Sequence, residues 1–141
     1  MNVSRIRALR GPNLWSRHTA IEAVVACEGA ENAIAGMPGF ENRLRQRFPG
    51  LAPLHAGTSL AHVLEAATLG LQAQAGCPVT FSRTQPTLEA GVYQVVVEYT
   101  EEPVGRMAFD TARALVAAAL ADEAFDLDAA LAALREKDED V

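Results

Sequence analysis

Four stretches of the chain have the composition and alternation of β-strands. They are rich in valine, isoleucine or tyrosine, or they alternate apolar with polar residues, as a half-buried strand requires. Ile6 and Ala8 alternate with arginines in the first stretch, and Tyr93, Val95 and Val97 share one side of the last. The predicted strands cover residues 2–10, 19–28, 79–83 and 92–100.

Four other stretches carry apolar residues at helical spacing. Phe40, Leu44 and Phe48 are four residues apart and the arginines between them fall off that line, which predicts a short amphipathic helix with a basic side facing solvent. A second helix begins at a capping Thr58 or Ser59. The predicted helices cover residues 40–48, 58–75, 105–121 and 127–137.

These elements alternate in pairs along the chain, in the order β-β-α-α-β-β-α-α. Paired strands joined by short connections favour antiparallel neighbours, and the helices must bury their apolar stripes against a sheet. The glycine-bearing segment 29–39 is expected to be a flexible connection. We therefore predict an α+β fold with a mostly antiparallel four-stranded sheet and packed helices.

Length and composition narrow the class of protein. With 141 residues, half of them hydrophobic, the chain suits one compact core. It has no apolar run of about 18 residues and no apolar block behind its first residues, so we expect a soluble cytoplasmic protein that does not enter a membrane. Cys27 and Cys77 have no CxxC partner, which predicts two buried free thiols.

The formal charge of −6 is concentrated at one end of the chain. From Asp122 onward there are eight acids against Arg135 and Lys137, so residues 1–121 are neutral overall. This balance predicts a domain over 1–121 followed by an acidic helical linker over 122–141. It does not provide the basic field that nucleic-acid binding needs. Eleven of the twelve cationic residues are arginines, which suits bidentate recognition of carboxylate or phosphate.

Three segments contain an unusual concentration of specific residues. They read LRGPNLWS at 9–16, GTSLAHVLE at 57–65, and FSRT at 81–84 together with GVYQVVVEY at 91–99. In this order and spacing they resemble the amino-terminal domain of cyanophycin synthetases. The resemblance implies a multidomain ATP-dependent ligase that builds polyaspartate and attaches arginine to each aspartate β-carboxylate, using ATP and magnesium in an ATP-grasp domain and a Mur-ligase-like domain. The chain lacks a GxxxxGK[ST] phosphate loop and is too short for an ATP-grasp fold, so we expect no ligation and no cofactor in these residues.

In this family the domain is understood to hold the growing polymer near the ligase sites. The implied partners are cyanophycin, an aspartate–arginine polymer, and the two ligase domains, with a homo-oligomer left open. A site for such a polymer should offer both cations and carboxylates, with an aromatic ring to stack on guanidinium. The candidate polymer-binding residues are Arg10, Asn13, Trp15, Arg83, Glu65 and Glu98. Ordinary structural roles are the alternative, such as an Arg83–Glu98 pair on a strand face.

Some members of the family carry a metal-peptidase-like HxxEH motif on the long helix. The matching positions here are His62, Glu65 and Ala66. Zinc chemistry needs a second histidine on the same helical face, and Ala66 cannot ligate a metal. We therefore expect no catalytic residues and no metal site, with His62 and Glu65 as degenerate positions. Two alternatives to polymer binding stay open: a metal-dependent peptidase that cuts the polymer into primers, and a structural domain that oligomerises through the helix 105–121.

Overall fold

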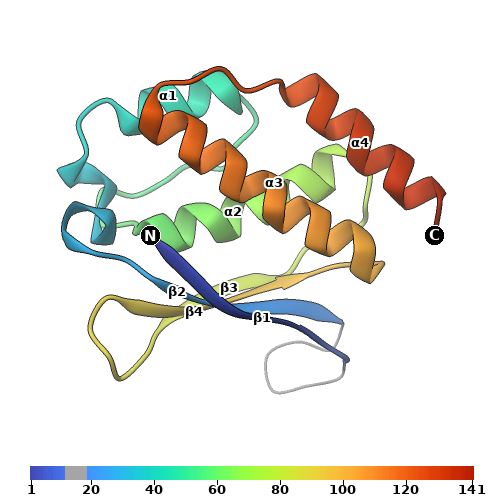
Figure 1. The fold of residues 1–141 in the computed structure, drawn as a ribbon, viewed down its shortest axis with the longest axis horizontal. Coiled ribbons are helices and arrows are strands. Elements are labelled where there is room, and N and C mark those ends of the chain that lie inside the picture. Colours follow the sequence, from blue (N-terminus) through green and yellow to red (C-terminus); the bar gives the residue numbers. More distant parts are fainter. Residues whose placement is uncertain (12–18) are drawn as a thin grey trace.

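A computed structural model describes residues 1–11 and 19–141 of the chain. Its described residues form one sheet of four antiparallel strands in the order β1-β2-β4-β3, with helices packed on it, which confirms the predicted α+β fold (Figure 1). The strands are β1 Asn2–Leu9, β2 Ala20–Ala26, β3 Ser82–Pro86 and β4 Val92–Glu98. The α-helices are α1 Phe40–Arg47, α2 Leu60–Gln74, α3 Glu102–Ala121 and α4 Leu127–Glu139.

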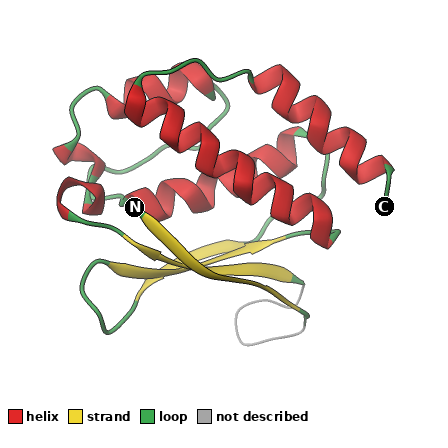
Figure 2. Cartoon of the chain, viewed as in Figure 1, coloured by secondary structure: helices red, strands yellow, loops and turns green. Residues whose placement is uncertain are grey.

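The helices all lie on one face of the sheet (Figure 2). Helix α2 packs on β3 and β4, α3 packs on α2 and touches β2, and α1 and α4 pack on α3. The inward residues of the central strands, Ile21, Val25, Val95 and Val97, join the helices in one apolar core. Alternation along the strands sends their neighbours to the opposite face. We call this second face, which no described helix covers, the open face.

Strand β3 begins three residues later than the sequence predicted and runs further. Val79 is buried in the core, but the backbone N–H groups of Thr80 and Phe81 bind the carboxylate of Glu98 rather than a neighbouring strand. The strand then continues to Pro86, which an edge strand tolerates because one side of it needs no donors. The predicted start of β3 was wrong because it is decided by the contact with Glu98, which is distant in the sequence and has no signal in a local pattern.

The helices begin where capping chemistry allows. The Ser59 hydroxyl accepts the His62 N–H at the start of α2, as predicted for this position. Helix α3 starts at Glu102, three residues before the predicted start, because Pro103 suits a first helical turn. The segment expected to be a flexible connection instead contains two short 3₁₀ helices, Gly29–Asn32 and Ile34–Gly36.

The arginines of α1 do not point into solvent as the amphipathic pattern suggested. Arg43 Nε donates to the carbonyl of Ala119 at 2.6 Å, and Arg47 Nε donates to the carbonyl of Glu123 at 2.6 Å. Ala119 lies in the last turn of α3, where helix carbonyls lack intrahelical partners and cations are favoured, and Glu123 follows the end of that helix. These arginines therefore fasten α1 to α3 and are not part of a free basic surface.

The acidic C-terminal residues form a docked helix. Leu131 and Leu134 of α4 lie in the same apolar core as the sheet. The division of the chain at Asp122 stays a prediction. No described helix is both long and apolar enough to cross a membrane.

Cys27 and Cys77 are buried and free, as the sequence predicted. Burial raises the pKa of both thiols above the ordinary value of 9.0. Because both pKa values are raised, the thiols stay protonated at neutral pH. The reactive form is the thiolate, so both side chains are unreactive there.

Candidate functional site

The open face carries a hydrogen-bonded row of polar side chains across β1, β2 and β4. Arg7 of β1 stands directly opposite Glu22 of β2, and its Nε donates to Glu22 Oε1 at 2.7 Å. Gln94 of β4 donates through Nε2 to the other oxygen, Oε2, at 2.7 Å. The Glu22 side chain is only 5% exposed, whereas that of Arg7 is 65% exposed. The buried carboxylate therefore holds a guanidinium that solvent and a ligand can reach.

Arg83 is aligned with this row on the far edge of the sheet, with the apolar Val96 of β4 between it and Glu22. Strand register places Arg83 opposite Val96, and Val96 opposite Glu22. With the Gln85 amide oriented to pair donor with acceptor, its oxygen accepts the Arg83 Nε–H at 3.0 Å. The row thus has an exposed arginine on each edge strand and a buried carboxylate between them. Strands lie about 4.8 Å apart, which separates the two arginine positions by about 14 Å.

Glu98 lies on the open face but is committed to the backbone. Its Oε1 accepts the N–H of Thr80 at 2.8 Å and that of Phe81 at 3.4 Å, and the residue is 5% exposed. A carboxylate that accepts backbone donors in this way holds the segment leading into β3. Its burial limits how far Glu98 can also meet a polymer.

Two further candidates lie elsewhere on the molecule. Glu65 is on α2, on the helix side of the sheet, and its carboxylate accepts the Ser82 hydroxyl at 2.6 Å. Arg10 follows β1 and is exposed. Its charge acts on Tyr99, whose pKa is raised by burial and by Glu102 although Arg106 and Arg10 oppose the rise. Strand register therefore places Arg83 and Glu98 on the same open face, whereas Glu65 lies on the helix side of the sheet. Asn13 and Trp15 lie outside the described residues.

The peptidase-like positions are occupied by local structure. Nδ1 of His62 lies 2.7 Å from the Ser59 hydroxyl at the cap of α2, and the ring packs edge-on against Tyr93 at a centroid distance of 5.7 Å. Ala66 packs against the core. Among residues 1–11 and 19–141 no three His, Cys, Asp or Glu side chains gather as a metal site requires. His62 completes a helix cap in this arrangement.

Sequence reasoning missed Arg7, Glu22 and Gln94 as site residues. Glu22 sits between Ile21 and Ala23, so alternation alone sends it to the face opposite the core. The alternation of β2 therefore indicates the face on which Glu22 lies, but the pairing of Glu22 with Arg7 depends on the register of β1 against β2. Gln94 lies inside the GVYQVVVEY segment, and its bond to Glu22 depends on the pairing of β2 with β4.

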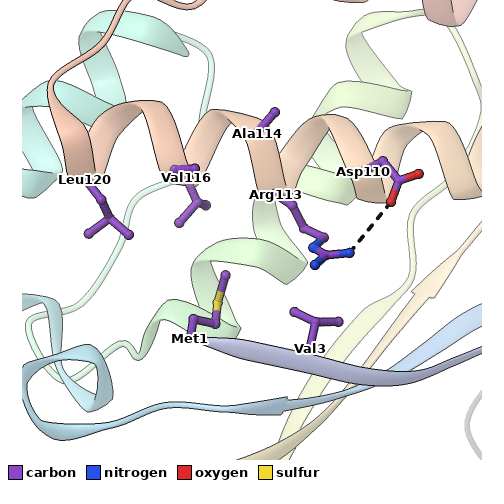
Figure 3. Close-up of a pocket in the computed structure, with 8 residues that line it drawn as sticks. Met1, Val3, Asp110, Arg113, Ala114, Val116 and Leu120 are labelled. Atoms are coloured by element: carbon purple, nitrogen blue, oxygen red, sulfur yellow. Dashed lines mark ion pairs between the residues drawn. The ribbon is translucent and has the colours of Figure 1, made fainter.

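A hollow of about 430 Å³ lies between the start of β1 and α3 (Figure 3). Its lining is largely apolar and includes Met1, Val3 and Leu120, while Asp110 and Arg113 form an ion pair of 4.0 Å at its edge. It contains few groups that could recognise a charged polymer. This surface is relevant to the structural alternative rather than to polymer binding.

The sequence matches known proteins over most of its length. Residues 22–121 match the model of the cyanophycin synthase-like N-terminal domain. The chain is 38% identical over 125 residues to the cyanophycin synthetase of Trichormus variabilis, covering 77% of this chain and 14% of that relative. It is 34% identical over 145 residues to the cyanophycin synthetase of Geminocystis herdmanii, covering 91% of this chain and 17% of that relative. The chain thus spans less than a fifth of these relatives and belongs to the family of cyanophycin synthase-like N-terminal domains.

Proposed function

We propose that this chain is the polymer-holding domain of a cyanophycin synthetase and that it holds the polymer on the open face of its sheet. The observation that carries this proposal is the row from Arg7 through the buried Glu22 to Arg83. Its exposed arginines belong to the two edge strands, so a ligand crossing the strands meets both.

The chemistry of the polymer fits this row. Each aspartate–arginine unit presents a carboxylate and a guanidinium, so a chain of units offers carboxylates at repeated intervals. Arginine binds carboxylates in a bidentate geometry, and two arginine positions about 14 Å apart can engage different units of one chain. Gln85 and Gln94 add amide groups that can donate to or accept from the polymer backbone.

Holding the polymer would assist catalysis without performing it. Weak attachment at a second site raises the effective concentration of a chain end at a ligase centre, because the second encounter becomes intramolecular. Amide-bond formation, with its ATP and magnesium, is assigned to the ATP-grasp and Mur-ligase-like domains and takes place outside these 141 residues.

Co-sedimentation of the chain with insoluble cyanophycin over a salt series tests this proposal. We expect the chain to pellet with the polymer at low salt and to be released progressively as salt rises. The reason is that exposed ion pairs are screened within about 10 Å at 0.1 M salt. The measured quantity is the fraction of chain in the pellet at each salt concentration.

Absence of retention at low salt would contradict polymer holding. The structural alternative would then be favoured, since the apolar hollow beside Met1, Val3 and α3 is a surface through which copies could associate. Light scattering on the same samples would report such association as a rise in mass with concentration. Release of soluble fragments that a chelator blocks would instead favour the peptidase alternative.

A further inference from the structure

Strand β1 contains a β-bulge between Ser4 and Arg7, where its pairing with β2 shifts by one residue. The register passes from Ser4 opposite Val24 to Arg7 opposite Glu22, so Arg5 and Ile6 together face the single residue between them on β2. Bulges of this kind re-aim side chains and cluster near functional sites. The bulge contains Arg5, which lies outside the three segments that resemble cyanophycin synthetases.

Arg5 adopts a backbone conformation that favours glycine. Its φ angle is +52°, in the left-handed region, where a Cβ atom crowds the neighbouring carbonyl. Non-glycine residues persist there when the surrounding structure imposes the conformation, and such residues concentrate at binding sites. A glycine would fit the bulge with less strain. An arginine at this position therefore indicates a role for its guanidinium.

A hollow of about 540 Å³ opens beside this bulge on the open face. Arg5 and Arg7 both line it, together with Glu22, Gln94 and Thr87. Residues from three separate segments of the chain therefore meet around one space. The volume is sufficient for a small charged group with part of the chain that carries it.

The lining separates into a buried support and two accessible cations. Both oxygens of Glu22 are occupied, one by Arg7 and the other by Gln94, at 2.7 Å each. Glu22 is thus a positioning residue that fixes the Arg7 guanidinium and has little surface of its own to offer. Arg5 is exposed, and no described side chain is paired with it. Two guanidiniums beside one hollow form a site for a planar anion, and a carboxylate matches their geometry.

We propose that this hollow is a carboxylate subsite in which Arg5 and Arg7 grip the free α-carboxylate of one polymer-borne arginine. The proposal rests on the polymer-holding function and deepens it. It assigns one unit of the polymer to the β1 side of the open face and leaves Arg83 to contact a more distant unit. Arg5 makes the subsite specific for a carboxylate. The bulge places its guanidinium beside that of Arg7 at the same hollow.

The variant Arg5→Gly separates binding from folding. Glycine accepts φ of +52°, so we expect its melting temperature to equal or exceed that of the unmodified chain. Loss of one charge-assisted contact should weaken binding of a soluble oligomer of three β-aspartyl-arginine units about tenfold, measured by isothermal titration calorimetry. Arg106→Gln removes an exposed arginine of α3, 42% exposed, and serves as the charge-matched control with unchanged affinity.

The outcomes distinguish this subsite from the wider proposal. Equal affinity of Arg5→Gly and the unmodified chain for the oligomer, with insoluble polymer still retained by both, would overturn the subsite and leave polymer holding intact. Failure of the unmodified chain to retain polymer at all would remove both. Titration with free arginine and with inorganic phosphate completes the test. Either ligand binding as tightly as the oligomer would overturn the assignment to a polymer-borne carboxylate.

Discussion

Replacing Arg7 and Arg83 together by glutamine is expected to weaken binding to cyanophycin about 100-fold. Each arginine contributes a charge-assisted contact of about 1.5 kcal/mol, and two such contacts correspond to that ratio. Stability should fall by about 1 to 2 kcal/mol, because the buried Glu22 carboxylate loses Arg7 and keeps Gln94, while the exposed side of the pair is screened by solvent. Binding is measured by co-sedimentation and stability by thermal unfolding.

The matched control changes the same charge elsewhere on the molecule. Arg106 and Arg113 of α3 are 42% and 43% exposed and form ion pairs with acids on their own helix. Changing both to glutamine removes two positive charges from a surface away from the open face. If this double variant loses as much binding as Arg7→Gln with Arg83→Gln, general charge attraction explains retention and the row on the open face does not.

Gly105→Ala is expected to destabilise the fold by about 2 kcal/mol, because the added methyl group overpacks the contact between α3 and Tyr99. A Cβ atom at Gly105 would lie 2.6 Å from the Cβ atom of Tyr99 and 2.8 Å from its Cγ atom. The Cβ atom of Tyr99 is fixed by the backbone and cannot rotate away, so α3 must shift off the end of β4. Chemical denaturation measures the change as a lower midpoint with an unchanged slope.

Gly57→Ala provides the control for that prediction. A Cβ atom at Gly57 would meet no atom within 4 Å. We expect a change within about 0.5 kcal/mol, typical of surface positions. A Gly105→Ala protein as stable as Gly57→Ala would show that α3 and Tyr99 do not pack as closely as the structure describes.

The fold was largely predictable because its core follows two simple periods. Val95 and Val97 alternate on β4 and turn to the helices, as the pattern required. The boundaries were less predictable where a distant residue decided them. Glu98 binds the backbone ahead of β3 and delays that strand, and Arg43 and Arg47 reach carbonyls about 76 residues away in the sequence. Contacts of that range have no signal in local spacing.

The candidate site was less predictable than the fold. The family motifs predicted Arg10, Asn13 and Trp15 as polymer-binding residues. The charged residues aligned on the open face are Arg7, Glu22 and Arg83. Assembling these three requires the order of four strands and their register, and neither follows from the sequence of one strand. The bulge that redirects Arg5 is also invisible in composition, since arginine is a poor indicator of a positive φ angle. Arg83 lies in one of the family motifs and also on the open face, and its role in binding stays a prediction.

Amide chemical-shift mapping shows which surface of the chain binds the polymer, which we propose is the open face. The measurement is a ¹⁵N correlation spectrum of the chain during titration with a soluble β-aspartyl-arginine oligomer. We expect shifts concentrated at Arg5, Arg7, Glu22, Arg83 and Gln94, with the outer side of α3 unaffected. Shifts confined to α3 around Arg113 and Leu120, with the amides of the open face unchanged, would contradict it.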